Sequence, residues 1–240
     1  PWMLILLLGT GLWLSICLRG IQIRSLAYAF QLTFSKERDG DGDISHFGSL
    51  MTSLAATVGT GNIAGVSTAV ALGGPGAIFW MWVTGLVGMA TKYAEGFLAI
   101  KYRDVNKHGE ISGGPMYYLE FGLKQKWLGI LFAIFGALAA FGIGNMIQSN
   151  TIASSLSKTL GTNDFLVGVI LAFLTAMVVL GGIKRIARIT SYFVPLMVLI
   201  YFIGATFVIL KNLSHLSSGI ALIFEHAFTG TAATGGFAGA

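Results

Sequence analysis

The chain has 240 residues, of which 55% are hydrophobic and only 10% are charged, and its mean hydropathy is +0.77. A soluble domain carries roughly a quarter of charged residues to cover its surface, so this composition excludes an ordinary soluble protein and predicts a polytopic helical membrane protein of the all-α class. The single cysteine, Cys17, excludes a disulfide framework or a cluster of thiolate metal ligands within the chain.

Apolar stretches long enough to cross a bilayer, about 17 to 25 residues, recur along the chain. The first could also be a signal peptide, but its positive charge follows the apolar run and no A-x-A cleavage site is present, which favours a true span. Two connections are predicted to be tight turns, 73–76 and 161–163, and two are longer and polar, 19–43 and 101–126. We predict seven spans: 2–18, 44–72, 77–100, 127–156, 165–183, 189–210 and a seventh from about residue 217 to the last residue.

The basic residues predict the orientation of these spans. Twelve of the fifteen Lys and Arg residues fall in connections on one side, whereas only Lys158 and Lys211 fall on the other and Lys92 lies within a span. The excess of positive charge marks the cytoplasmic side, so residue 1 is predicted to be extracytoplasmic and the long polar connections cytoplasmic. Topology therefore accounts for the pI near 9.4, and no nucleic-acid partner is expected.

The second span contains Gly-Thr-Gly-Asn-Ile-Ala at 59–64, which fits the pattern G-x-G-x-x-A of dinucleotide-binding loops. A genuine loop of that kind follows a strand and has an acidic residue about 20 positions later. Here residues 80–86 read WMWVTGL without an acid, the motif lies midway along a span, and no Gly-Lys-Ser/Thr follows. The sequence therefore argues against a nucleotide site of either kind.

Two glycines so close together predict a broken helix, because each weakens a helix by about 1 kcal/mol relative to alanine. Unwound backbone is tolerated at membrane depth only where it lines a cavity enclosed by protein. The outer half-helix would then offer N–H groups to a carboxylate and the inner half carbonyls to a small cation, with Asn62 able to cap exposed amides. The alternative is that these glycines only let neighbouring helices pack closely.

Two other features support a site built around this span. Residues 232–239 read Ala-Ala-Thr-Gly-Gly-Phe-Ala-Gly and echo the first glycine-rich stretch, as expected of an inverted repeat with a site between its halves. Gly136, Ala140, Gly144 and Gln148 follow at four-residue steps, which predicts one helix face that approaches a neighbour and extends the Gln148 amide toward it. A purely interhelical hydrogen bond from Gln148 is an equally open interpretation.

Six blocks of the sequence stand out, 59–65 (GTGNIAG), 71–76 (ALGGPG), 89–95 (MATKYAE), 113–118 (GGPMYY), 142–146 (GIGNM) and 181–186 (GGIKRI). Together they resemble the alanine/glycine:cation symporter family, the sodium:alanine symporters, and the resemblance extends over essentially the whole chain. The resemblance implies a LeuT-type fold, with a five-plus-five inverted repeat and one extra helix, and it implies that this chain, which lacks an initiator Met and stops at Ala240, is part of a longer protein. The implied regions are the extra N-terminal helix 1–18, a cytoplasmic linker 19–43, the first five-helix repeat 44–210 and the start of the second repeat 211–240.

The resemblance also implies the residues of the site. The substrate carboxylate would bind backbone N–H groups of Thr60 and Gly61, and the coupling sodium would bind carbonyls of Ala55 and Val58. No acidic residue lies in these segments, and a bound zwitterion can itself neutralise the cation, which avoids a fixed buried charge. The remaining implied substrate contacts are Thr57 and Asn62 on the first broken helix, which face substrate or a second ion, Gln148 on the fourth span, and Gly235, Gly236 and Phe237 on the second broken helix.

The expected function is import of a small amino acid, alanine or glycine, by sodium symport across the plasma membrane, with the bilayer and the sodium ion as partners and no further cofactor. A proton-coupled or other-substrate transporter, or a channel or receptor-like protein, remains an alternative. An enzyme is not expected, since no catalytic cluster is evident, and the four scattered histidines lack the spacing of metal ligands. Lys92 and Glu95 are three residues apart and are expected to form a structural pair near the cytoplasmic end of their helix.

Overall fold

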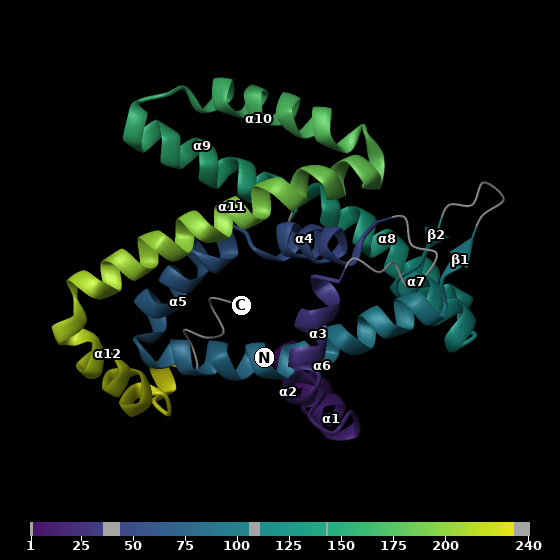
Figure 1. Cartoon of the computed structure of the whole chain (residues 1–240), viewed down its shortest axis with the longest axis horizontal. Helices are drawn as coiled ribbons and strands as arrows, with labels where there is room; N and C mark the ends of the chain where they lie inside the picture. Colours follow the sequence, from purple (N-terminus) through teal and green to yellow (C-terminus); the bar gives the residue numbers. More distant parts are fainter. Residues whose placement is uncertain (1, 36–43, 106–110, 143, 233–240) are drawn as a thin grey trace. The chain divides into compact units, whose positions relative to one another are not determined.

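The computed structural model describes residues 2–35, 44–105, 111–142 and 144–232 (Figure 1). Within these ranges the chain is helical apart from turns and one two-stranded antiparallel ribbon, so the all-α prediction is confirmed. The elements are α1 (Trp2–Cys17), α2 (Ile21–Arg24), α3 (Leu26–Thr33), α4 (His46–Thr57), the 3-10 turn η1 (Thr60–Asn62), α5 (Ala64–Gly73), α6 (Gly76–Lys101), β1 (Asp104–Val105), β2 (Ile111–Ser112), α7 (Pro115–Tyr117), the π-helical turn η2 (Tyr118–Gly122), α8 (Lys126–Gly142), α9 (Met146–Leu160), α10 (Asp164–Val179), α11 (Gly182–Lys211) and α12 (Leu213–His226).

The two predicted tight turns are confirmed, and their residues explain them. Gly74 and Gly161 have φ values of 71° and 68°, in the left-handed region that favours glycine. Asn163 then caps α10, because its side-chain oxygen accepts the N–H of Phe165 (2.9 Å) and that of Leu166 (3.4 Å). Each turn therefore ends one helix and begins the next within a few residues.

Not all seven predicted spans reach spanning length in the described residues. Two stretches are long and apolar enough, Gly182–Lys211 and the range Lys126–Leu160, which takes in α8, α9 and the residues between them. A third is obtained if the bent pair α4 and α5 counts as one span. Helices α1 and α10 have 16 residues each, or about 24 Å against a hydrocarbon core of about 30 Å. Helix α6 is long enough at 26 residues, but glycines, tryptophans and Lys92 make it less apolar.

The predicted helix face with four-residue steps is wrong. Helix α8 ends at Gly142 and α9 begins at Met146, so Gly136 and Ala140 lie on one helix and Gln148 lies on the next, with Gly144 in the turn between them. Gly142, Gly144 and Asn145 are all poor helix formers, which explains why the apolar run is interrupted here.

Other elements also differ from the predicted connections. The connection predicted at 19–43 contains the helices α2 and α3 before its described part ends at Ser35. Of the predicted seventh stretch, residues 217–226 lie in α12, which has 14 residues, a turn follows, and residues 230–232 are helical again. The rest of this stretch, 233–240, lies outside the described residues.

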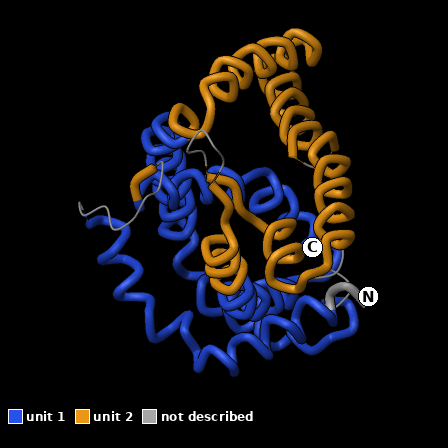
Figure 2. The backbone as a smooth tube through the Cα atoms, turned by 90° about the vertical axis from the view of Figure 1, so that its right-hand side faces the viewer, with its two compact units in different colours: residues 1–37, 46–91, 187–240 blue, residues 38–45, 92–186 orange. Residues whose placement is uncertain are grey.

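The chain divides into two compact units (Figure 2). The first unit comprises residues 1–37, 46–91 and 187–240, and the second comprises residues 38–45 and 92–186. In the first unit, α1 packs on α6 at Gly11, where an added Cβ would collide with Val87.

The second unit contains a similarly close approach between helices. A Cβ at Gly129 of α8 would lie 2.8 Å from the carbonyl oxygen of Met116 in α7. Glycine at this position therefore lets the backbones of α7 and α8 approach each other.

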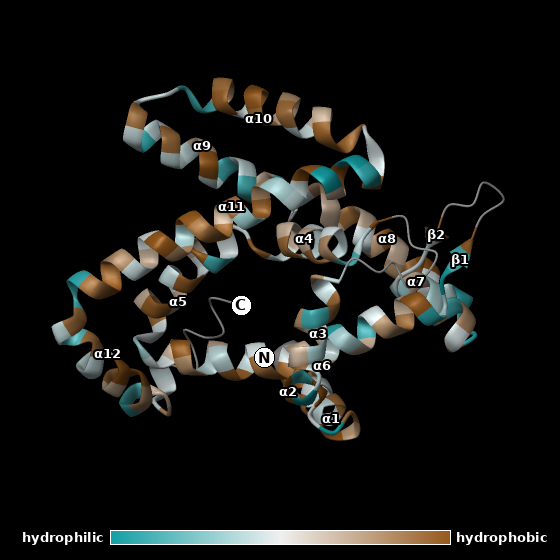
Figure 3. Ribbon diagram, in the orientation of Figure 1, coloured by the Kyte–Doolittle hydropathy of each residue, from teal (hydrophilic) through white to brown (hydrophobic). Residues whose placement is uncertain are grey.

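Most large apolar side chains of the described residues point outward. None of them is fully buried, and the residues with no exposed surface are alanines such as Ala69, Ala77 and Ala90. Leu180 is 86% exposed and Phe165 80% exposed. In Figure 3 the brown of hydrophobic residues covers most of α10 and α11. Surfaces of this kind need lipid or further protein to cover them, which indicates an integral membrane protein.

Candidate substrate and ion site at a broken helix

The second predicted span is broken where its glycines predict. Helix α4 ends at Thr57, the 3-10 turn η1 occupies Thr60–Asn62, and α5 starts at Ala64. The two helical parts meet at an angle of 66°. The prediction of a discontinuous helix is therefore confirmed.

Backbone hydrogen bonds show how the helix changes at the break. The α-helical ladder of α4 reaches Val58, whose N–H donates to the Leu54 carbonyl (2.7 Å). The next two bonds join residues three apart rather than four, as in a 3-10 turn. They run from Asn62 N–H to the Gly59 carbonyl (3.1 Å) and from Ile63 N–H to the Thr60 carbonyl (3.2 Å). The α-helical pattern resumes when Ser67 N–H donates to the Ile63 carbonyl (3.1 Å).

The side chain of Asn62 stabilises the break through a hydrogen bond to the backbone. Its Oδ1 accepts the N–H of Gly59 at 3.1 Å, as expected for a capping residue. In a continuous α-helix that N–H would donate to the carbonyl four residues earlier, which belongs to Ala55. The cap therefore removes the helical donor of a carbonyl that the resemblance assigns to sodium.

The second predicted sodium ligand loses its helical donor in a different way. The partner of the Val58 carbonyl in a continuous helix would be the N–H of Asn62. This N–H donates instead to the carbonyl of Gly59. Two carbonyls at the end of α4 are thus released from helical pairing, which is the arrangement that a small cation needs.

The space beside Gly61 is open in the described residues. An added Cβ at this position would meet no atom within 4 Å in the described structure. A glycine needed for close helix packing would have a neighbouring backbone or side chain at this point, as Gly129 has. Within the described residues, Gly61 therefore makes no close helix contact of the kind that Gly129 makes.

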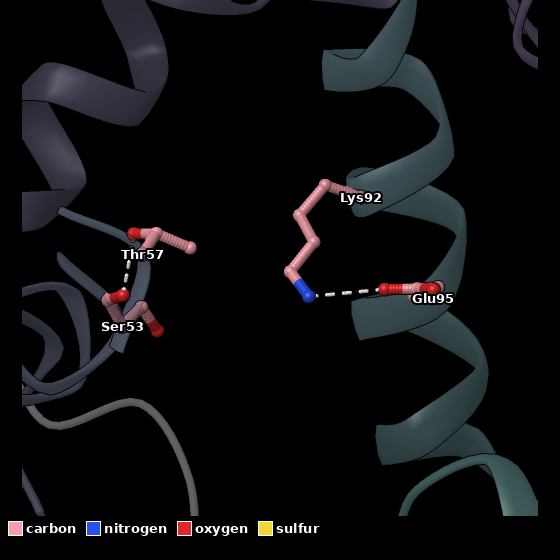
Figure 4. A network of polar contacts seen from close by, with 4 residues as sticks. All are labelled: Ser53, Thr57, Lys92 and Glu95. Carbon is pink, nitrogen blue, oxygen red and sulfur yellow. Dashed lines mark hydrogen bonds and ion pairs between the residues drawn. The ribbon is translucent and has the colours of Figure 1, made fainter. Parts of the chain in front are cut away.

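The hydroxyl of Thr57, the last residue of α4, lies at the end of this helix that adjoins the break. Its Oγ donates to the Ser53 carbonyl at 2.7 Å within the same helix (Figure 4). Since the proton is used inside the helix, the lone pairs of the oxygen remain available as acceptors for a cation or an ammonium group.

Gln148 lies in the second unit, where it lines a pocket of about 640 Å³ between α9 and α10. The same pocket is lined by the polar residues Asn145, Ser149 and Thr175 and by small residues of both helices. Thr57, Thr60, Gly61 and Asn62 belong to the first unit. The predicted contacts Gly235, Gly236 and Phe237 lie outside the described residues.

The predicted pair of Lys92 and Glu95 is confirmed at 3.0 Å on α6 (Figure 4). Its side chains are 74% and 46% exposed in the described structure. In the connection 101–126, burial raises the pKa of Tyr118 above its usual value, and the Glu95 carboxylate adds to this while Lys92 opposes it.

Known proteins with similar sequences point to transport. The profile of the sodium:alanine symporter family matches residues 1–240. The sodium/alanine symporter AgcS of Methanococcus maripaludis is 52% identical over 245 residues, which cover 100% of this chain and 54% of AgcS.

Two Bacillus subtilis proteins extend this comparison. The protein named "Probable sodium/glutamine symporter GlnT" is 38% identical over 239 residues, which cover 99% of this chain and 50% of GlnT. "Amino-acid carrier protein AlsT" is 40% identical over 222 residues, which cover 92% of this chain and 47% of AlsT. The chain thus spans about half the length of the curated relatives that it matches.

The names of these relatives describe symporters and a carrier, in agreement with the expectation that the chain is not an enzyme. The family match covers every residue of the chain. Together with the identity to AgcS, it shows that this chain belongs to the sodium:alanine symporter family.

Proposed function

We propose that the full-length protein imports a small amino acid, alanine or glycine, together with sodium across the plasma membrane. The observation that carries this proposal is the break between α4 and α5, at which the carbonyls of Ala55 and Val58 have lost their helical donors. Family membership supports cation-coupled amino-acid transport, and the break supplies the chemistry that such transport needs.

In the proposed site, sodium binds the carbonyls of Ala55 and Val58 at the negative end of the α4 dipole. The substrate carboxylate binds the N–H groups of Thr60 and Gly61, where the outer half-helix begins. Thr57 and Asn62 face the substrate or a second ion. Because the described segment 54–63 contains no carboxylate, the substrate itself provides the negative charge that balances the cation.

The rest of the site would come from other parts of the protein. Gln148 would contact the substrate from α9, and Gly235, Gly236 and Phe237 would contribute from a second broken helix. This arrangement requires the LeuT-type inverted repeat, with residues 44–210 as its first half and residue 1 on the extracytoplasmic side. No cofactor besides the coupling ion is needed.

The decisive experiment is uptake of labelled alanine and glycine into proteoliposomes that contain the full-length protein. We expect accumulation when a sodium gradient points inward and none when sodium is equal on both sides. A proton gradient in place of sodium tests the proton-coupled alternative, and competition by glutamine tests the substrate class named for GlnT. Current through the membrane without accumulation of substrate would establish the channel alternative and contradict symport.

A further inference from the structure

We propose that Thr52 of α4 and Thr190 of α11 form a latch that holds the inner half of the broken helix and opens when the site releases its cargo to the cytoplasm. The two Oγ atoms lie 3.3 Å apart although the residues are 138 positions apart in the sequence. Both residues belong to the first unit. The inference rests on the proposed transport function.

The protons available to the two hydroxyls define the direction of the bond. Thr52 Oγ also lies 2.7 Å from the Gly48 carbonyl, whereas Thr190 Oγ lies 3.2 Å from the Ala187 carbonyl. Each hydroxyl has one proton, so the shorter contact keeps the Thr52 proton on Gly48 and Thr190 donates to Thr52.

A neighbouring side chain lowers the free-energy cost of this donation. Ser191 Oγ donates to the same Ala187 carbonyl at 2.6 Å. Thr190 can therefore turn its proton toward Thr52 without leaving that carbonyl unsatisfied. When the latch opens, Thr190 can return to Ala187, so neither state contains an orphaned hydroxyl.

A contact of this kind is strong enough to bias a helix and weak enough to open. A hydrogen bond between neutral groups contributes about 0.5 to 1.5 kcal/mol net, and interhelical hydrogen bonds in membranes average about 0.6 kcal/mol. That energy changes a two-state equilibrium about threefold to tenfold. A permanent structural clamp would need several such bonds or a charged pair.

The position of Thr52 connects the latch to the site. Thr52 lies on α4 one helical turn before the Ala55 carbonyl and two turns before the break. The buried residues Gly48 and Met51 of α4 lie on the same helical face as Thr52. Because the 66° break separates α4 from α5, α4 can tilt as a rigid element about the break, and the proposed sodium ligands move with it.

A reversible crosslink tests the latch directly. The full-length protein would carry Thr52→Cys and Thr190→Cys in a background with Cys17→Ser and no other cysteine, and free thiols would be counted before and after oxidation. We expect the disulfide to form, sodium-dependent alanine binding to persist, and uptake to fall at least tenfold and return on reduction. The Oγ separation of 3.3 Å shows that the ends of the two side chains are in contact, which is why this pair is chosen for the crosslink.

Each other outcome of the crosslink contradicts the latch. Failure of the disulfide to form would show that the pair is not adjacent, and unchanged uptake after oxidation would show that α4 need not separate from α11. Loss of binding in the oxidised protein would make the pair part of the binding geometry rather than of release. Absence of sodium-driven uptake in the Cys17→Ser background alone would instead contradict the proposed function.

Single substitutions provide a second test without a crosslink. We expect Thr190→Val, which removes the donor but keeps the shape, to raise the sodium concentration for half-maximal uptake about threefold to tenfold. Thr190→Ser should restore the wild-type value. The matched control is Thr159→Val on α9, which should leave sodium dependence unchanged, because the Thr159 hydroxyl donates to the Ser155 carbonyl of its own helix (2.8 Å). A Thr190→Val protein with wild-type sodium dependence would overturn the latch.

Discussion

At the scale of single residues, Asn62 links the local sequence to the proposed ion site. Its Oδ1 takes the N–H of Gly59, and this bond denies the Ala55 carbonyl its helical donor. The Asn62 side chain, which lies just before α5, thereby exposes a proposed sodium ligand, the Ala55 carbonyl, at the end of α4. Asparagine suits this position because its short side chain carries an acceptor and no charge.

Replacing Asn62 should therefore change the affinity for sodium more than it changes the stability of the fold. In Asn62→Ala the Gly59 N–H is free to return to Ala55, so we expect the half-maximal sodium concentration for uptake to rise about fivefold, in line with a capping energy of about 1 kcal/mol. Asn62→Ser retains an acceptor and should recover most of the loss. Sodium titration of alanine uptake in proteoliposomes measures the effect, and equal sodium dependence in the alanine and serine variants would contradict the role assigned to the cap.

The contribution of the peptide N–H at Gly61 can be separated from that of glycine itself. Gly61→Pro removes the N–H proposed for the substrate carboxylate, and we expect alanine uptake to become undetectable. Gly61→Ala keeps the N–H, and because the added Cβ has open space, it should retain measurable uptake.

Removal of the Thr60 hydroxyl is a milder change at the same part of the proposed site. Thr60→Val should raise the KM for alanine several-fold through loss of its polar group. Unchanged uptake in both Thr60→Val and Gly61→Pro would place the substrate elsewhere.

At the scale of elements, close approaches at glycine fix how neighbouring helices meet. Gly129 of α8 lies against the carbonyl of Met116, at 2.8 Å from the position of its missing Cβ, whereas Gly136 of the same helix has nothing within 4 Å. We expect Gly129→Ala to destabilise the protein by about 1 to 3 kcal/mol through overpacking. Gly136→Ala should be neutral or stabilise it by up to about 1 kcal/mol. Thermal unfolding followed by tryptophan fluorescence in detergent compares the two, and equal midpoints would contradict the predicted contact.

The same scale shows which features the sequence can predict. The break at Gly59 and Gly61 was predictable because glycine acts on the helix that contains it, and the turns at Gly74 and Gly161 were predictable for the same reason. The four-residue pattern that ends at Gln148 does not lie on one helix, since two glycines and Asn145 interrupt the helix on which the pattern depends.

The partner of Thr52 was not predictable from a single sequence. The contact with Thr190 joins residues 138 positions apart and leaves no local pattern. Of the proposed site, the broken helix is therefore a property of local sequence, whereas its contacts with other helices depend on tertiary structure.

At the scale of the whole molecule, the lone cysteine offers a clean test of orientation. Cys17 is exposed at the end of α1, next to the first basic residues of the chain. In a full-length protein that retains no other cysteine, we expect a membrane-impermeant maleimide to leave Cys17 unmodified in intact cells and to label it in inside-out vesicles. Labelling from outside the cell would reverse the predicted topology, in which basic connections are cytoplasmic.

The 66° corner between α4 and α5 has a consequence for how ion and cargo depend on each other. Two half-helices in line would place a cation and an anion one above the other on a common axis, each facing an opposite dipole. A corner instead lets them lie side by side, so that each becomes part of the other's coordination sphere. In the proposed site sodium would then raise the affinity for the amino acid, and by reciprocity the amino acid would raise the affinity for sodium by the same factor. The stoichiometric link between the two fluxes would thus originate in the angle at which one helix is bent.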